Sequence, residues 1–416
     1  MRILWSSNAI WAKTGYGNQT ALIIPRLFAL GHQVGLFAWW GLQGGALNSA
    51  LEHNGKTYDL PMYPMSADKY GNDVVAAHAT KAFSADIIIT LIDAWVLDAA
   101  KHSPAGVRWC PYFPIDMHPI PPPVLARVKD SFQPIVYSRF GERMAREAGL
   151  DPRYVPHMID TSAFAPGDRI AARDALGWPK DAFIVGMVAA NKGFPSRKSL
   201  PEQIRAFAKV AAKHPDMRLY LHTARGGEHE YGDLNLPELC ALEGISDKVL
   251  FPDSYALFMG YPDDYMVNVY RGLDVLSSVS MGEGFGIPIV EAQACGCPVI
   301  VGDWTSMSEL CFGGWKVPKP GKYIADYGWI EQWFYTPLAA DQYTPLVADI
   351  IEAYEQAYTW AHEPTIKNAA RAGALQYDAD LVAEQYWKPV LAEIEQRMHG
   401  ASELESRMDG LVKVAA

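Results

Sequence analysis

The sequence predicts an α/β protein made of two doubly wound domains, and three observations support this fold class. A strand, a glycine-containing loop, a helix and a second strand follow one another at the start of the chain, and the same order recurs around residues 277–301. Such units build open parallel sheets that are covered by helices. A proline-containing segment, Val155–Asp168, separates two series of these units, and 416 residues are enough for two domains.

The first unit opens with an apolar strand over Met1–Ser6. The loop after this strand holds Gly15, Tyr16 and Gly17. An amphipathic helix is expected from about Gln19 to Leu30, followed by a second strand. The loop lacks the G-x-G-x-x-G spacing, and no acidic residue follows the second strand, so a dinucleotide site is not expected.

Three later apolar runs have the length and composition of buried parallel strands. These runs are Asp86–Ile92, Val107–Phe113 and Pro134–Tyr137. Residues 41–82 are weakly patterned and are expected to leave the sheet and to help form a binding surface. The stretch from Tyr112 to Pro123 is rich in proline, which predicts a loop at the carboxyl edge of the sheet, where ligands bind in such folds.

The domain division is expected at Val155–Asp168. Residues 1–166 form the first domain in this prediction, and residues 167–378 form the second, which restarts with a strand at Phe183–Ala189. A long helix over Ala379–Arg397 is expected near the end of the chain. We expect the segment of about 379–416 to complete the first domain, with frayed structure from about Gly400.

The most informative motif is MGEGFGIPIVEAQACGCPVIVGD, which begins at Met281. Its two glutamates, Glu283 and Glu291, are separated by a glycine-rich loop, and Pro288 fits the first turn of a helix. The free amides of such a loop and helix N-terminus bind an anion well, most often a phosphate. The alternative is a buried strand–helix–strand unit in which the two glutamates are incidental.

Two basic residues, Arg197 and Lys198, precede a helix whose start is marked by Ser199 and Pro201. Cations at a helix N-terminus are unfavourable unless an anion binds there. Arginine and lysine both suit phosphate oxygens, so this pair is a second candidate phosphate site. An exposed basic loop is the alternative interpretation.

These motifs resemble the E-x7-E signature of retaining glycosyltransferases with the GT-B fold, in family 4 (glycosyl transferases group 1). The run AQACGCPVI, the hinge-like VPHMIDTSAFAPGD and the opening ILWSSNAIWAKTGYGNQTA add to the likeness, and the opening resembles enzymes of bacteriophages and actinobacteria. The resemblance implies two Rossmann-like domains that face each other across a cleft. It also implies a C-terminal helix that crosses back to the first domain.

The resemblance implies roles for the motif residues. Glu283 would hold sugar hydroxyls, Glu291 would bind the ribose, and Arg197 with Lys198 would neutralise the leaving diphosphate. Two glycine-containing segments would approach the nucleotide sugar: Gly15, Tyr16 and Gly17, and Gly284, Phe285 and Gly286.

The family usually has a histidine after a central strand of the first domain. This chain offers Asp116 and His118 there, and Asp93 after the preceding strand. The nucleotide base is expected near Tyr255, and His222 faces the cleft if its strand has the expected register. Loop-structuring side chains and a core histidine are the alternatives.

The function implied is transfer of a hexose from a nucleotide-diphosphate sugar (UDP- or GDP-hexose) to a hydroxyl acceptor, with retention of configuration. No prosthetic group and no metal are expected, because the nearest Asp-x-Asp-like pair, Asp263 and Asp264, fits the start of a helix. Two alternatives are a phage-type transferase that acts on hydroxymethylated DNA or on a virion protein, and a non-catalytic nucleotide-binding protein. Arg139, Arg143 and Arg146 share one helix face and are the candidate DNA contacts, although a solvated helix face is the preferred interpretation.

Composition sets the remaining limits. The net charge is −11, and residues 1–166 are nearly neutral with 14 basic and 13 acidic residues, which argues against broad binding of nucleic acid. Five cysteines without disulfide-like spacing favour a reducing compartment. No run approaches the ~20 apolar residues of a membrane span. A cytoplasmic protein is therefore expected, in the host cytoplasm if the gene belongs to a phage.

Overall fold

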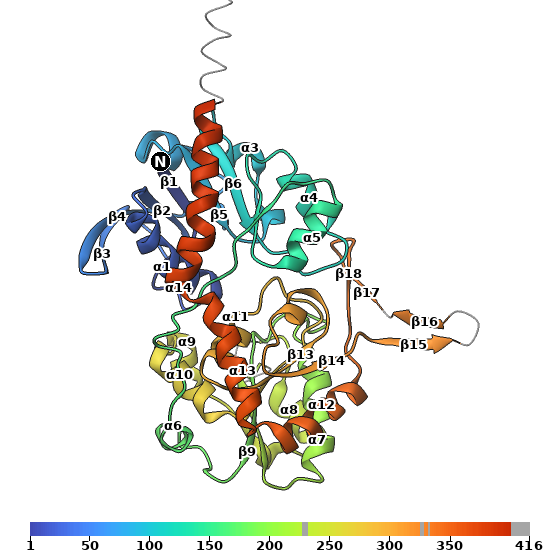
Figure 1. The fold of residues 1–416 in the computed structure, drawn as a ribbon. Coiled ribbons are helices and arrows are strands. Elements are labelled where there is room, and N and C mark those ends of the chain that lie inside the picture. Colours follow the sequence, from blue (N-terminus) through green and yellow to red (C-terminus); the bar gives the residue numbers. More distant parts are fainter. Residues whose placement is uncertain (227–231, 325–327, 332, 401–416) are drawn as a thin grey trace, which may run out of the picture.

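The computed structural model describes residues 1–226, 232–324, 328–331 and 333–400. Figure 1 shows two lobes, one above the other. The N-terminal lobe contains an eight-stranded sheet and the helices that cover it, and the C-terminal lobe contains a six-stranded sheet with its own helices. Each sheet is the core of its lobe.

The sheet of the N-terminal lobe has the strand order β3-β4-β2-β1-β5-β6-β7-β8. Its strands are β1 Arg2–Asn8, β2 Gln33–Trp40, β3 Leu47–His53, β4 Lys56–Pro64, β5 Ile87–Leu91, β6 Arg108–Phe113, β7 Ile135–Val136 and β8 Arg153–Tyr154. All neighbouring strands are parallel except β3 and β4. The antiparallel β3–β4 pair occupies the weakly patterned residues 41–82, where no strand was predicted.

The sheet of the C-terminal lobe is parallel and has the order β11-β10-β9-β12-β13-β14. Its strands are β9 Phe183–Val188, β10 Met217–His222, β11 Val249–Leu250, β12 Val275–Ser278, β13 Val299–Gly302 and β14 Gly314–Val317. Two small antiparallel pairs follow it in the chain. They are β15 Gly321–Ile324 with β16 Gly328–Glu331, and β17 Phe334–Tyr335 with β18 Asp341–Gln342.

The helices connect the strands in the manner of doubly wound sheets. They are α1 Gly15–Ala29, α2 Val75–Ala77, α3 Ala99–His102, α4 Pro122–Val128, α5 Arg139–Glu147, α6 Arg169–Leu176, α7 Leu200–Ala211, α8 Leu236–Leu242, α9 Ser254–Met259, α10 Asp263–Gly272, α11 Ile287–Ala294, α12 Val347–Trp360, α13 Pro364–Ala374 and α14 Ala379–Val382. Helix α10 begins at Asp263, so the Asp263 and Asp264 pair lies at the start of a helix, as predicted, although the N-cap position itself is Pro262. A 3-10 turn, Thr305–Glu309, follows β13.

Helix α1 starts earlier than the sequence predicted. The hydroxyl of Thr14 accepts a hydrogen bond from the amide of Gly17 at 3.0 Å, which is the geometry of an N-cap. The glycine loop is therefore the first turn of the helix, and it lies directly at the carboxyl end of β1.

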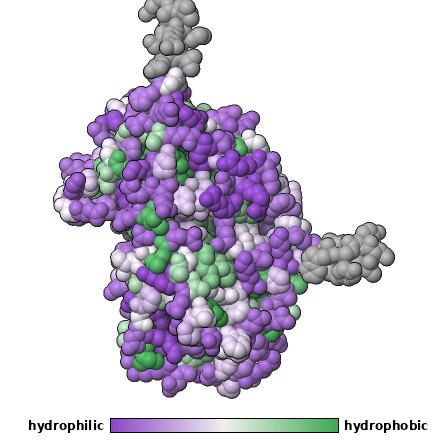
Figure 2. Space-filling view, in the orientation of Figure 1, coloured by the Kyte–Doolittle hydropathy of each residue, from purple (hydrophilic) through white to green (hydrophobic). Residues whose placement is uncertain are grey.

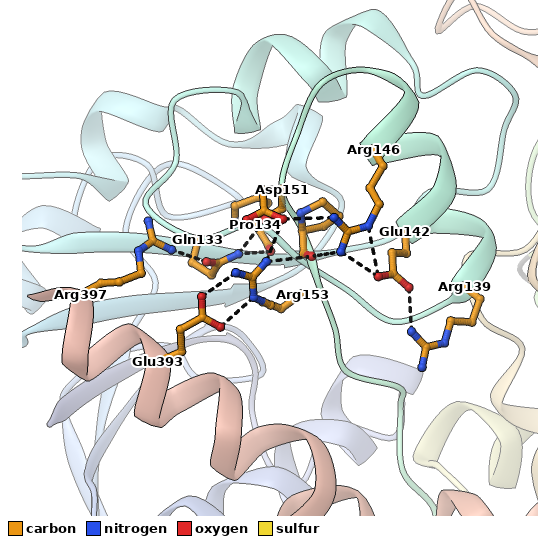
Figure 3. Close-up of polar contacts among 10 residues, drawn as sticks. Gln133, Pro134, Arg139, Glu142, Arg146, Asp151, Arg153, Glu393 and Arg397 are labelled. Atoms are coloured by element: carbon orange, nitrogen blue, oxygen red, sulfur yellow. Dashed lines mark hydrogen bonds and ion pairs between the residues drawn. The ribbon is translucent and has the colours of Figure 1, made fainter.

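The C-terminal helix crosses back to the N-terminal lobe, as predicted (Figure 1). It continues from α14 through a π-helical stretch, Ala383–Trp387, to residue 400. The ring of Trp387 packs edge-on against that of Trp5 at 5.7 Å between centroids, and Glu393 pairs with Arg153, with 2.8 Å between its Oε2 and Arg153 Nε (Figure 3). The prediction for residues beyond 400 falls outside the described residues.

The surface differs between the lobes. In the view of Figure 2, hydrophilic residues dominate the face of the N-terminal lobe, whereas more pale and hydrophobic residues reach the face of the C-terminal lobe. Within the described part of the chain, we find no helix with both the length and the apolar character that a membrane span requires.

Candidate functional site

The candidate site is a cavity of about 750 Å³ that is lined by residues of both lobes. The carboxyl ends of β1, β5 and β6 and the loops after them form one wall. The other wall is formed by the loops after β9 and β12 and the start of α11. Ten of the predicted site residues line it: Gly15, Tyr16, Asp116, Arg197, Lys198, Glu283, Gly284, Phe285, Gly286 and Glu291.

Glu283 is the centre of a charge cluster on the C-terminal wall. The ammonium of Lys198 pairs with its carboxylate, the hydroxyl of Ser280 donates to Oε1 at 2.6 Å, and Arg197 Nη1 lies 3.5 Å from Oε2. Burial alone would raise the pKa of Glu283, but the charges of Lys198 and Arg197 outweigh it and lower the pKa to about 2. Glu283 is therefore an anion at neutral pH although it is buried.

The two cations of this cluster respond differently to burial. Burial lowers the pKa of Lys198 despite the attraction of Glu283. Burial acts in the same direction on Arg197, but Glu283 and Asp116 outweigh it and raise the pKa of its guanidinium. Arg197 thus keeps a fixed positive charge at a half-buried position, where an electrostatic interaction is stronger than in water.

The backbone of the glycine-rich loop is fixed by the 3-10 turn after β13. The hydroxyl of Thr305 accepts from the amide of Glu283 at 3.2 Å. The hydroxyl of Ser306 lies 2.7 Å from the carbonyl oxygen of Glu283 and 2.6 Å from that of Phe285. The motif analysis did not identify these two residues, because their role depends on the contact between two loops and no sequence pattern marks it.

Glycine is required in this loop because the two lobes approach each other closely there. A Cβ atom on Gly282 would collide with the carbonyl oxygen of Asp116, and one on Gly284 would collide with the ring of Pro114. Gly286 has a φ of +117° at the N-cap of α11, a conformation that other residues rarely adopt. The start of α11, with Gly286, Ile287 and Pro288, borders the cavity.

Glu291 lies about one turn into α11 and faces the cavity rather than the core. Its Oε2 accepts a hydrogen bond from the hydroxyl of Tyr270 at 2.7 Å. Tyr270 is buried and holds the carboxylate in place. A carboxylate has about four acceptor positions, so one that is held in this way can also accept a hydrogen bond from a ligand.

The N-terminal wall holds Tyr16, Asp93, Asp116, Tyr137 and His157. The hydroxyl of Tyr16 donates to Asp93 Oδ2 at 3.4 Å. Burial, with a smaller contribution from the negative charge of Asp116, raises the pKa of Asp93 to about 6. Asp116 itself lies 3.5 Å from Arg197 of the other lobe and accepts from Gln342 Nε2 at 3.3 Å.

Two histidines of the cavity are neutral. Burial lowers the pKa of His157 to about 3 and that of His222 to about 4. His157 Nδ1 lies 3.0 Å from the hydroxyl of Tyr112, and His222 Nδ1 lies 2.8 Å from that of Tyr220. His157 belongs to the hinge-like segment Val155–Asp168, which the sequence analysis used only as the domain division and did not assign to the site.

Three predicted site residues lie outside the cavity lining. The amide of Gly17 is used by the cap of α1, and a Cβ atom there would collide with the carbonyl group of Ala12, so this glycine serves packing. His118 stacks on Trp333 at 5.3 Å between ring centroids. Tyr255, on α9, is 72% exposed and points to solvent.

The arginine face of α5 is largely neutralised by acidic residues (Figure 3). Arg139 and Arg146 both bond to Glu142, at 2.8 and 3.0 Å, and Arg146 also pairs with Asp151 at 3.1 Å. Arg143 is exposed. The described residues contain no group of three or more His, Cys, Asp or Glu side chains placed to hold a metal ion.

Comparison with known proteins identifies the fold and one domain. Residues 168–312 match the family described as Glycosyl transferases group 1. The chain is similar to D-inositol 3-phosphate glycosyltransferases. It is 36% identical to that of Stackebrandtia nassauensis over 150 residues, which are 35% of this chain and 32% of that protein. It is 35% identical to that of Mycolicibacterium gilvum over 144 residues, 34% of this chain and 29% of that protein. The chain thus spans about a third of the length of the curated relatives it matches.

Two solved structures resemble nearly the whole chain. Sucrose-phosphate synthase from Thermosynechococcus elongatus has a TM-score of 0.70 at 17% identity and covers 96% of this chain and 100% of its own. HepE from Anabaena, solved with UDP and glucose, has a TM-score of 0.63 at 19% identity and covers 94% of this chain and 100% of its own. The likeness confirms the predicted GT-B fold.

Proposed function

We propose that this protein is a retaining glycosyltransferase that moves a hexose from a nucleotide-diphosphate sugar to a hydroxyl acceptor without a metal ion. The observation that carries this proposal is the cluster of Arg197, Lys198 and Glu283 beside the N-terminus of α11, with Glu291 in the same cavity. The match of residues 168–312 to a glycosyltransferase family and the fold support it.

The diphosphate of the donor binds between the amides at the start of α11 and the cations Arg197 and Lys198. Helix N-termini and basic side chains both stabilise phosphate. The leaving diphosphate gains negative charge as the bond to the sugar breaks. Fixed positive groups therefore stabilise the transition state more than the bound donor.

The two glutamates bind the neutral parts of the donor. Glu291, held by Tyr270, accepts hydrogen bonds from the ribose hydroxyls. Glu283 is ionised and holds hydroxyls of the transferred sugar. As UDP is the nucleotide solved with HepE, UDP-hexoses are the first donors to test, and GDP-hexoses are the second.

The acceptor approaches from the N-terminal wall, on the same face of the sugar as the leaving group. The bond between the anomeric carbon and the phosphate oxygen breaks, and a bond to the acceptor oxygen forms. The acceptor proton goes to the departing phosphate oxygen. In this scheme residues 1–166, completed by about 379–416, form the acceptor domain, and residues 167–378 form the donor domain.

The state of the cysteines supports a reaction in the cytoplasm. If a phage encodes the protein, this is the cytoplasm of the host cell. The five cysteines are free, and four of them are buried, as is usual in a reducing compartment. Acceptors of macromolecular size, such as hydroxymethylated DNA or a virion protein, gain no support from α5, because Arg139 and Arg146 pair with Glu142 and Asp151.

The test is a screen of UDP-, GDP- and ADP-sugars with the full chain. We expect release of the nucleoside diphosphate from a UDP- or GDP-hexose, at a rate that an acceptor increases. The anomeric configuration of the product, measured by NMR, should equal that of the donor. Failure of every donor to bind or to be hydrolysed contradicts the proposal, and a product of inverted configuration contradicts the retaining mechanism.

A further inference from the structure

The N-terminal wall of the cavity carries more negative than positive charge. Among the described residues of that lobe, the charged side chains that line the cavity are Asp93, Asp116 and Lys13. The rest of this wall is built from hydroxyl and ring groups such as those of Tyr16 and Tyr137. Such a surface suits a ligand with many hydroxyl groups and repels a ligand with a phosphate group.

On the opposite wall, Arg197 and Lys198 already pair with carboxylates. Lys198 pairs with Glu283, and Arg197 lies 3.5 Å from both Glu283 and Asp116. In the proposed function, the diphosphate of the donor binds to these same two cations. An acceptor that arrives after the donor therefore meets the carboxylates of the N-terminal wall when Arg197 and Lys198 are already engaged by the diphosphate.

Asp93 is the carboxylate of this wall that can still accept a hydrogen bond. It is the second residue after β5, at the carboxyl edge of the sheet, and its partner Tyr16 donates at the long distance of 3.4 Å. Asp116, by contrast, is engaged by Arg197 and Gln342. A carboxylate has about four acceptor positions, so Asp93 has room for the hydroxyl of a ligand.

We infer that the acceptor is an uncharged polyhydroxy compound, of the sugar or cyclitol class, and that Asp93 accepts a hydrogen bond from a hydroxyl next to the reacting one. This inference rests on the proposed function and adds the acceptor class to it. Asp93 thereby orients the acceptor toward the anomeric carbon, while the single proton of the reacting hydroxyl goes to the departing phosphate oxygen. The relatives named as D-inositol 3-phosphate glycosyltransferases carry a phosphorylated compound in their name, so this chain differs from them in acceptor charge.

The first experiment measures acceptor choice at pH 7.5, with the donor found in the screen above. It uses matched pairs: myo-inositol with inositol 3-phosphate, and glucose with glucose 6-phosphate, within a panel of neutral sugars and polyols, together with hydroxymethylated DNA. Product formation is measured by mass spectrometry. We expect kcat/KM to be at least about tenfold higher for the neutral member of a productive pair. Preference for the phosphorylated member, product from DNA alone, or donor hydrolysis without product from any neutral compound overturns the inference.

The second experiment uses the near-isosteric variant Asp93→Asn, with Asp130→Asn, an exposed position outside the cavity, as the matched control. We expect Asp93→Asn to reduce transfer to the neutral acceptor at least about tenfold and to leave nucleotide affinity and acceptor-free donor hydrolysis within about twofold. Nucleotide binding by the variant shows that it is folded. Equal loss of hydrolysis and transfer would assign Asp93 to the donor and overturn the inference.

The pH dependence provides a readout that a merely structural role would not change. Asp93 faces Tyr16, Asp116 and Arg197, and its carboxylate form is the acceptor of the hydrogen bond. The rate of transfer by the wild type should therefore increase as the pH rises through about 6. This increase should be absent in Asp93→Asn. If no donor binds at all, the proposed function fails; if donors are hydrolysed but phosphorylated acceptors are preferred, only this inference fails.

Discussion

The two walls of the cavity place carboxylates in opposite electrostatic surroundings. On the C-terminal wall, Lys198 and Arg197 outweigh burial and hold the pKa of Glu283 at about 2. On the N-terminal wall, burial raises the pKa of Asp93 to about 6. The difference follows from neighbouring charge rather than from residue type. The C-terminal wall is thus organised before any ligand arrives, whereas the hydrogen bond that Asp93 accepts from Tyr16 is long, at 3.4 Å.

The largest effect is expected from removing a cation of the organised wall. Lys198→Ala should lower kcat by roughly ten- to a hundredfold with little change in the KM of the donor. Loss of one hydrogen bond to a charged group costs about 1.5–3 kcal/mol, and the leaving diphosphate needs it most in the transition state.

Steady-state kinetics of the Lys198 variant would be compared with those of Lys180→Ala. Lys180 is an exposed lysine of the same lobe that pairs with Asp174. The control should behave like the wild type. A raised KM with unchanged kcat would show that Lys198 binds the donor uniformly and does not act in the chemical step.

A smaller and different effect is expected at Glu291. The ribose does not change during the reaction, so Glu291→Ala should raise the donor KM about tenfold and leave kcat nearly unchanged. Glu291→Gln keeps an acceptor for the hydroxyl of Tyr270 and serves as the fold-preserving companion. Loss of kcat with an intact KM in both variants would place Glu291 in the chemical step.

The same comparison explains what could be predicted from the sequence. Glu283 and Glu291 belong to one strand–loop–helix unit, so their spacing predicts a shared site, and Arg197 with Lys198 precede a helix of the same sheet. Tyr137 and His157, by contrast, come from segments far from Tyr16 in the chain. The strand order β1-β5-β6-β7 brings these residues together, and no local pattern encodes that order.

Closeness to a motif in the sequence did not predict which residues line the cavity. Gly17 is one residue from Tyr16, and His118 is two from Asp116, yet both lie outside the cavity lining. The cap of α1 uses the amide of Gly17, and Trp333, from a late segment of the chain, stacks on His118. Tertiary contacts of this kind cannot be inferred from spacing along the chain.

The contact that joins the lobes beside the site should respond to pH. Glu309, in the turn after β13, accepts hydrogen bonds from the amides of Arg139 and Phe140 at the start of α5, at 2.9 and 3.3 Å. Burial outweighs these bonds and the charges of Arg139 and Arg143, and it raises the pKa of Glu309 from 4.5 to about 7. A raised pKa means that the contribution of this group to stability is fully present below about 4.5 and is lost as the pH rises through about 7.

Glu309→Gln removes the titration while keeping one acceptor oxygen. The melting temperature of the variant minus that of the wild type should therefore increase as the pH rises from 5 to 8. The increase should correspond to a change in the free energy of unfolding on the order of 1–3 kcal/mol. Thermal unfolding of both proteins across this range is the measurement. A difference in melting temperature that stays constant with pH would show that Glu309 does not titrate in this contact.

The smallest effect is expected from removing metal ions with a chelator. This experiment tests whether the C-terminal wall stabilises the leaving diphosphate without a metal ion. Arg197, Lys198 and the amides at the start of α11 all border the place where the diphosphate leaves in the proposed mechanism. Because these groups supply the positive charge, transfer after dialysis against EDTA should stay within about twofold of the untreated rate. A metal-dependent transferase assayed in parallel verifies the chelation. Complete loss of transfer that Mn²⁺ or Mg²⁺ restores would show that a bound cation, rather than Lys198 and Arg197, stabilises the leaving group.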